Sequence, residues 1–149
     1  MKQFNLLIAL CAICTTFLFT SCEKEDTIVD TWYGVKAEYY FDGVLEKTEY
    51  FGGIGAQAVN YYYTFNENGT YSMTLIRGDE PFTQTGTYSL SADKKTLILK
   101  SSKANSTGLD DSVYCVVRAL NKKDLVFEMN EPFKNHDGET GVVVYYCSR

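Results

Sequence analysis

Short stretches in which apolar and polar residues alternate, each followed by a turn, most constrain how this 149-residue chain can fold. Tyr71, Met73 and Leu75 alternate with serine and threonine, which is typical of a strand with one buried and one solvated face. Asp42-Gly43 lies between two apolar-rich stretches and is a strong signal of a two-residue hairpin. No helical period is sustained over three turns. The sequence therefore predicts an all-β fold.

The same pattern predicts eight or nine short strands, mostly adjacent in the sequence. They cover residues 32–41, 44–51, 57–65, 70–76, 82–90, 96–99, 113–120, 125–129 and 141–149. The polar stretches 101–111 and 131–140 are expected to be loops, and the two prolines, Pro81 and Pro132, are expected to lie in turns.

Consecutive hairpins favour an antiparallel meander. Closure of the meander into an up-and-down barrel would remove both exposed edges. A β-sandwich is the alternative, although an immunoglobulin-like sandwich would have its tryptophan between two cysteines, and here Trp32 precedes both candidates. Nine strands would make the first and last strands parallel. Either one predicted strand is therefore absent, or the barrel closes in a less simple way.

The N-terminus has the layout of a secretory signal. A single Lys2 precedes an apolar run over residues 4–19, and this run is shorter than the roughly 20 residues of a transmembrane helix. Ser21-Cys22 resembles the lipobox of bacterial lipoproteins, which implies cleavage after residue 21 and lipid attachment to Cys22. We expect a signal over 1–21, a lipidated cysteine and acidic tether over 22–30, and a β-domain over 31–149. An ordinary signal peptide that is cleaved nearby is the alternative.

The tether also bears on localisation. Glu23-Lys24-Glu25-Asp26 is similar to the lysine-plus-acidic export signal of Bacteroidetes surface lipoproteins. This resemblance implies a protein that is lipid-anchored in the outer membrane and exposed at the cell surface. A solvated charged spacer is the simpler reading of the same four residues.

The charge of the chain excludes one class of partner. Without residues 1–21 the chain has 128 residues, enough for one domain, with 13 basic and 19 acidic side chains. Nucleic-acid binding needs concentrated lysine and arginine, and this acidic chain has no basic cluster. The same balance predicts that the body of the domain stays off an anionic lipid surface.

Several motifs together resemble one family. Thr31-Trp32, Phe65-Asn66-Glu67-Asn68-Gly69-Thr70-Tyr71, Gly86-Thr87-Tyr88-Ser89-Leu90 and a final strand ending in Arg149 are similar to the lipocalin-like lipoproteins of Bacteroidetes. The resemblance implies an up-and-down barrel in which Trp32 plugs one end and Arg149 stacks on it. In lipocalins a glycine usually lies two places before the tryptophan, whereas here Asp30 does.

Cys115 and Cys147 remain after the signal and the anchor are set aside, and an even pair in an exported protein suggests a disulfide. The predicted order of strands argues against it. It places the two residues two strands apart, about 9.5 Å, whereas bridged Cα atoms are rarely more than about 7 Å apart. We therefore expect two free, half-buried thiols.

No pattern predicts catalysis, a metal or a cofactor. His136 is the only histidine, and neither a second histidine nor clustered cysteines could complete a metal site with it. Gly52-Gly53-Ile54-Gly55 is not followed by the lysine and hydroxyl residue of a phosphate-binding loop. A serine nucleophile would have only His136 as its base, with no elbow motif around it. We expect a protein that is not an enzyme.

The aromatic side chains point to binding. We expect six residues to face the barrel interior as candidate ligand-lining positions: Tyr61, Tyr63, Phe65, Tyr71, Met73 and Tyr88. An eight-stranded barrel can be filled by such side chains or can hold one small ligand, whose polar atoms would pair with buried hydroxyls. Two functions stay open. One is a binder of a small apolar or amphipathic molecule. The other is a protein-interaction or accessory lipoprotein with a filled core and working loops at 52–56, 101–111 and 131–140.

Overall fold

The computed structural model describes residues 26–53, 58–78, 80–102, 112–134, 138 and 140–149. They form nine strands, and the all-β prediction is confirmed. The strands are β1 (Asp30–Phe41), β2 (Val44–Tyr50), β3 (Val59–Phe65), β4 (Thr70–Arg77), β5 (Glu80–Leu90), β6 (Thr96–Ser101), β7 (Ser112–Leu120), β8 (Asp124–Lys134) and β9 (Thr140–Ser148).

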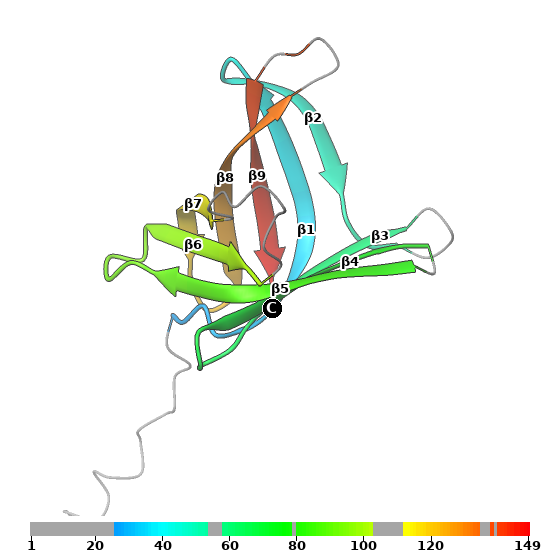
Figure 1. Cartoon of the computed structure of the whole chain (residues 1–149). Helices are drawn as coiled ribbons and strands as arrows, with labels where there is room; N and C mark the ends of the chain where they lie inside the picture. Colours follow the sequence, from blue (N-terminus) through cyan, green and yellow to red (C-terminus); the bar gives the residue numbers. More distant parts are fainter. Residues whose placement is uncertain (1–25, 54–57, 79, 103–111, 135–137, 139) are drawn as a thin grey trace, which may run out of the picture.

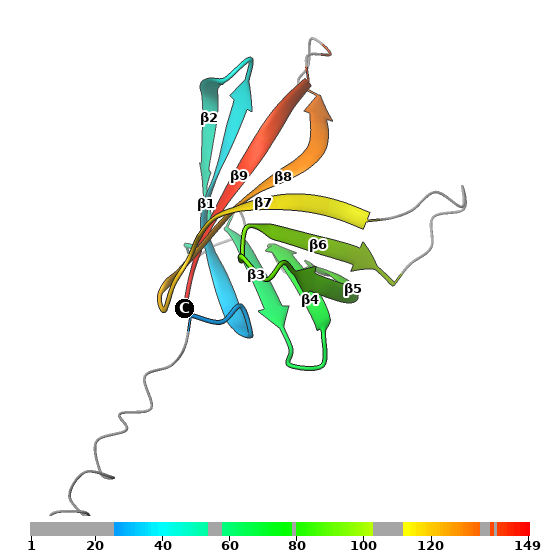
Figure 2. The same cartoon turned by 90° about the vertical axis from the view of Figure 1, so that its left-hand side faces the viewer.

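All nine strands belong to one antiparallel sheet, with the order β2-β1-β3-β4-β5-β6-β7-β8-β9 and an additional pairing of β1 with β9. That last pairing closes a barrel of eight strands, so the predicted up-and-down barrel is confirmed over the sandwich alternative. Figure 1 shows β8, β9, β1 and β2 rising side by side, while β3, β4 and β5 leave β1 near its lower end. Figure 2 shows β3 to β6 grouped on the opposite side from β2, with β7 in between.

The extra strand explains why an odd number can close an antiparallel barrel. β1 pairs with β3 through Asp30–Tyr33 and with β2 through Lys36–Phe41, in both cases antiparallel and along the same edge. β2 and β3 are therefore two segments that share one position in the barrel. Counted as one position, β2 and β3 give the barrel eight positions, and β9 therefore pairs with β1 in the antiparallel orientation.

A bulge in β1 divides the barrel along its length. The register against β9 shifts between Gly34 and Lys36, so inward positions change from Trp32 to Ala37 and Phe41. Gly34 is required here because an added Cβ would lie 2.9 Å from the Phe51 ring and 3.0 Å from Tyr61 Cβ. The bulge thus lets the sheet bend without exposing either inner stretch of β1.

Two predictions on loops and turns were wrong. Residues 131–134 continue β8 rather than form a loop, and both prolines lie in strands. Pro81 pairs with Ile76 of β4 in the part of β5 that has no described pairing with β6. Pro132 lies where the β8–β9 register shifts between Met129 and Phe133. Proline is tolerated in strands at unpaired edges and at bulges, which a search for turn residues does not distinguish.

A cluster of polar side chains covers the outer side of the β1–β9 seam. Glu38, only 8% exposed, accepts hydrogen bonds from Lys36 Nζ at 2.5 Å, Tyr146 Oη at 2.7 Å and Tyr40 Oη at 2.8 Å. The hydrogen bond from Lys36, followed by those from the tyrosines, lowers the pKa of Glu38 to about 2. Because Tyr146 belongs to β9 and the others to β1, this carboxylate joins the two strands that close the barrel.

The ends of the barrel differ. We call the closed half the end that holds the first described residues, the C-terminus and the turns at 66–69, 91–95 and 121–123. We call the open half the opposite end, which includes the β1–β2 turn (Figure 1). The largest side chains with almost no exposure, among them Trp32, Phe65 and Leu125, lie in the closed half.

Candidate functional site

The closed half ends in a plug around Trp32. This side chain has 0% exposure, and its Nε1 donates a hydrogen bond to the Ile28 carbonyl at 2.8 Å. The guanidinium of Arg149 lies over the indole, with Cζ 4.5 Å from the ring centroid. Arg149 also donates from Nε to the Lys122 carbonyl at 2.8 Å. The first strand, the last strand and the β7–β8 turn are therefore tied together at this end.

Asp30 adds a charged partner to the plug. Its Oδ2 lies 3.3 Å from Arg149 Nη1, which also donates to the Thr27 carbonyl at 3.3 Å. The position that is usually glycine in lipocalins thus supplies a carboxylate to the stacked arginine in this chain. The ion pair is shielded on one side, because the Arg149 side chain is only 6% exposed.

Packed aromatic rings fill the barrel above the plug. Phe65 stacks on Tyr63 with centroids 5.9 Å apart, and Tyr63 meets Phe127 edge to face at 5.2 Å. These three side chains are at most 1% exposed. Offset stacking and edge-to-face contacts are favourable arrangements of aromatic rings. The closed half is consequently a filled core with no room for a ligand among these rings.

A layer of nearly parallel rings separates the closed half from the open half. Tyr61 stacks on Phe51 at 5.5 Å and on Tyr145 at 5.4 Å, and the Phe51 and Tyr145 rings are 6.5 Å apart. Tyr145 also stacks on Phe127 at 5.5 Å. We call Phe51, Tyr61 and Tyr145 the ring layer. The hydroxyls of Tyr61 and Tyr63 are 2.8 Å apart and hydrogen-bonded. Burial raises the pKa of Tyr61, Tyr63 and Tyr145, so these phenols stay neutral at physiological pH.

Polar groups lie on the inner side of the open half. Tyr39 donates a hydrogen bond to Glu49 Oε2 at 2.9 Å, and Lys47 Nζ lies 3.5 Å from the same oxygen. Burial and then the bond to Glu49 raise the pKa of Tyr39, while Arg77 of β4 acts in the opposite sense. The register places Tyr39 and Glu49 inward with Ala37, so this polar rim faces the interior above the ring layer.

The six candidate lining residues do not form one surface. Tyr63, Phe65 and Tyr71 are almost completely buried within the core cluster, against which Met73 and Tyr88 pack with part of their surface exposed. Tyr88 belongs to the closed half, where its hydroxyl donates to the Asn66 carbonyl at 3.0 Å. Only Tyr61, at 8% exposed, and Met73 border the open half.

Sequence reasoning missed the other members of this inner surface. Tyr39, Phe51 and Tyr145 are not among the six residues that the sequence predicts to line the interior. The bulge at Gly34 shifts the alternation in β1, so a single period through residues 32–41 does not assign Tyr39 correctly. The signal for Tyr145 was its spacing of two from Cys147 on the same inward face.

Cys115 and Cys147 are not joined by a disulfide, as the predicted order of strands indicated. The prediction that they are half-buried was wrong, because they are only 1% and 3% exposed. Cys115 lies opposite Met129, whereas Cys147 lies opposite Leu125, so β8 separates them. Burial raises the pKa of the Cys147 thiol to about 12. The thiol is therefore protonated and inert as a nucleophile at neutral pH.

Other predicted features lie outside the described residues. These include Cys22, His136 and parts of the predicted loops at 52–56, 101–111 and 131–140. In the described part of the chain, no three His, Cys, Asp or Glu side chains are placed to hold a metal ion. A search of the same residues finds no helix with the length and hydropathy of a membrane span.

Comparisons with known proteins agree with this architecture. The model of the lipocalin-like domain family matches residues 28–127, and the chain belongs to that family. An uncharacterized protein from Bacteroides eggerthii DSM 20697 has a similar structure, with a TM-score of 0.51 and 15% identity over 83% of this chain and 99% of that one. At this identity the likeness shows the fold alone. No curated protein sequence matches the chain.

Two further solved structures match with lower TM-scores. Lobster apocrustacyanin A1 has a TM-score of 0.43 and 9% identity over 81% of this chain and 59% of that one. A triple mutant of the bovine odorant binding protein has a TM-score of 0.42 and 11% identity over 79% of this chain and 70% of that one. Both likenesses are too distant to carry an argument about this chain.

Proposed function

We propose that this protein is a lipid-anchored, non-enzymatic binder that holds one small amphipathic molecule in the open half of its barrel. The observation that carries the proposal is the ring layer. Phe51 and Tyr145 face inward yet keep part of their surface exposed, whereas the rings below them are fully covered. An inward apolar surface that the protein itself does not cover is what a small hydrophobic ligand requires.

The inner surface also suggests which way the ligand lies. Its apolar part would rest on the ring layer, with Met73, Leu75 and Met129 as apolar neighbours that pack against the same core. Its polar part would point toward the rim, where Tyr39, Glu49 and Arg77 offer donors and acceptors. A purely apolar ligand would leave these rim groups to water.

The anchor would fix the direction in which the open half faces. Only three residues lie between Cys22 and Asp26, so four steps of at most about 3.5 Å each connect them in an extended chain. Asp26 lies at the closed half, where its carbonyl accepts a hydrogen bond from Lys94 Nζ at 2.6 Å. With lipid on Cys22, the closed half would stay within roughly 14 Å of the membrane surface, and the open half would point away.

Native mass spectrometry of the mature protein, before and after denaturation, tests the proposal. We expect a small molecule that is bound in the native state and released on unfolding. Titration with the fluorescent fatty acid cis-parinaric acid should show saturable one-to-one binding, which Tyr145→Ala weakens about tenfold through the loss of ring contact. Tyr88→Phe, in the closed half, is the matched control and should bind as the original protein does. A ligand-free native mass together with no saturable binding would contradict the proposal.

A protein-interaction role is the second candidate, and exposed apolar side chains on the outer surface favour it. Tyr50 of β2 is 73% exposed and Val44 is 64% exposed, on a strand whose described pairing is with β1 alone. Such a strand can accept a further strand from a partner. Cross-linking from position 50 in cells, with a ligand-free barrel, would favour this candidate over the first.

A further inference from the structure

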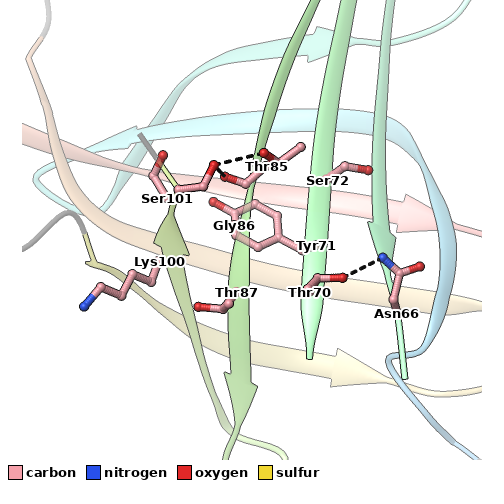
Figure 3. Close-up of a pocket in the computed structure, with 10 residues that line it drawn as sticks. Asn66, Thr70, Tyr71, Ser72, Thr85, Gly86, Thr87, Lys100 and Ser101 are labelled. Carbon is pink, nitrogen blue, oxygen red and sulfur yellow. Dashed lines mark hydrogen bonds between the residues drawn. The ribbon is translucent and has the colours of Figure 1, made fainter. Parts of the chain in front are cut away.

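A pocket on the outside of the barrel is independent of the ring layer. It has a volume of about 510 Å³ and lies over β4, β5 and β6, next to the β3–β4 turn. Figure 3 shows Thr70 and Ser72 on β4 beside Thr85 and Thr87 on β5, with Lys100 on β6, on the other side of β5 from β4. We call it the β4–β6 pocket. These side chains point outward, since they alternate with the buried residues Tyr71 and Gly86.

The composition of the pocket is unusual for this acidic chain. Hydroxyls, one carboxamide and one ammonium supply all the polar side chains of the lining, and no carboxylate is among the ten residues. Ser72 and Thr87 have no hydrogen-bond partner for their hydroxyls among the described residues, whereas Thr85 Oγ1 pairs with Ser102 Oγ at 3.0 Å. Groups that both donate and accept, beside one cation, suit a ligand rich in hydroxyls that also carries a negative charge.

Gly86 lets β5 and β6 pack closely beside the pocket. An added Cβ would lie 2.0 Å from the Lys100 carbonyl oxygen and 2.7 Å from Tyr71 Cε1, so no other residue fits between these groups. Gly86 and Tyr71 line the pocket together with the hydroxyl side chains. Apolar carbon beside hydroxyls matches the apolar face and the equatorial hydroxyls of a pyranose ring.

The polar surface continues beyond the pocket. A row of hydroxyl side chains follows the pairing from β1 to the end of β6: Thr31, Thr64, Ser72, Thr85 and Ser102. Neighbouring members are about 4.8 Å apart, the spacing of strands in a sheet. Tyr33 and Tyr62 form the next pair along β1 and β3, and the Tyr33 side chain is 52% exposed. An exposed tyrosine ring offers a surface on which a second sugar ring can stack.

We propose that the β4–β6 pocket is a saccharide-binding site whose first subsite takes an acidic sugar, with its carboxylate on Lys100 and its hydroxyls on Ser72, Thr85 and Thr87. Further sugar units follow the hydroxyl row toward Tyr33. A single lysine is too little positive charge for a nucleic-acid backbone, which separates this site from a polyphosphate site. The site does not rest on the binding role of the barrel interior, because the two surfaces lie on opposite faces of the sheet.

The test is binding of the mature protein to immobilised oligosaccharides, half of them containing uronic acid and half neutral. We expect binding to acidic members, which Lys100→Gln and the double variant Thr85→Val/Thr87→Val each weaken about tenfold through lost hydrogen bonds. Thr83→Val lies two residues from Thr85 on the same face of β5, outside the pocket, and is the matched control that should bind normally.

Three outcomes would overturn the site: no binding to any member, equal binding to neutral and acidic members, or equal loss in Thr83→Val. Chemical shifts from amides 70–72, 85–87 and 100–102 should move in a titration with D-glucuronate, while those of the ring layer should not. Tyr145→Ala, which removes part of the proposed interior site, should leave saccharide binding unchanged. The two proposals can therefore fail separately.

Discussion

The closed and open halves of this barrel differ in how completely their inward side chains are buried. In the closed half, Trp32, Tyr63 and Phe127 meet across the interior and exclude water. In the open half, β2 replaces β3 along β1, and the inward residues Tyr39 and Tyr145 keep part of their surface exposed. An eight-stranded barrel is just wide enough for side chains to fill. The difference teaches that a local departure from eight regular strands changes how completely the inward side chains cover one another.

The two halves should differ most in how much stability is lost when an inward side chain is truncated. Trp32→Ala should lower the free energy of unfolding by about 3–5 kcal/mol, because it removes a fully buried ring and leaves a cavity. Met73→Ala, at a partly exposed inward position, should lower it by about 1 kcal/mol. Denaturant unfolding curves measure both. Equal losses would show that the open half is packed as tightly as the closed half.

The stacked arginine should contribute to the closed half alone. Arg149→Met removes the guanidinium from the indole and from two carbonyls, and we expect a loss of about 2 kcal/mol in the free energy of unfolding. Arg118→Met is the control, since Arg118 pairs with Glu128 on the exposed surface and should cost below about 0.5 kcal/mol. If the two substitutions cost the same, Trp32 is held without its arginine.

The seam between β1 and β9 should be sensitive to acid. Because the pKa of Glu38 is lowered from 4.5 to about 2 in the folded protein, the ionised carboxylate stabilises the fold above pH 4.5. That contribution is lost as the pH falls toward 2. Glu38→Gln should therefore cost about 1 kcal/mol at neutral pH and flatten the pH dependence between 4.5 and 2.

Thermal unfolding at several pH values measures this effect. Glu46→Gln, at an exposed position of β2, should keep the original pH dependence and is the control. If the stability of Glu38→Gln and of the original protein depends on pH in the same way, the Glu38 carboxylate does not stabilise the closure of the barrel.

The smallest energetic effect concerns the thiols, whose chemistry reports access to the interior. A pKa of about 12 for Cys147 reduces its thiolate at pH 8 by about 1000-fold relative to an ordinary thiol with a pKa of 9.0. In a Cys22→Ser variant, a disulfide reagent should label neither Cys115 nor Cys147 until denaturant is added. Rapid labelling of the native protein would mean that the closed half opens readily.

Much of the fold followed from the sequence because strand alternation is a local property. The alternation of Tyr71, Met73 and Leu75 predicted β4, which the structure confirms. Asp42-Gly43 predicted the turn between β1 and β2, and both of these residues have positive φ in the structure. The prediction that Pro81 and Pro132 lie in turns was wrong, because a proline marks a backbone nitrogen that cannot donate a hydrogen bond and does not by itself mark a turn. Whether the missing N–H donor disrupts a strand depends on whether a neighbouring strand would have accepted a hydrogen bond from it.

The candidate site was less predictable. The sequence placed Tyr61, Tyr63 and Phe65 on one face, and they do share it, but nothing in their spacing separates a ring in a filled core from a ring at its edge. Tyr145 and Phe51 reach Tyr61 from strands that are far away in the chain. The hydroxyl row could not be predicted from the sequence, because its two ends, Thr31 and Ser102, are far apart in the chain.

The sequence by itself determined the strands, their antiparallel order and the inward face of most of them, since these depend on the period of two and on turn residues. Only the tertiary structure decided that β2 and β3 share one edge of β1, and with that which half is closed and which is open. It also decided that hydroxyl side chains of β4 and β5 and Lys100 of β6 line one outer pocket. These features depend on contacts between residues far apart in the chain, and no local pattern of residues encodes the distance across a barrel.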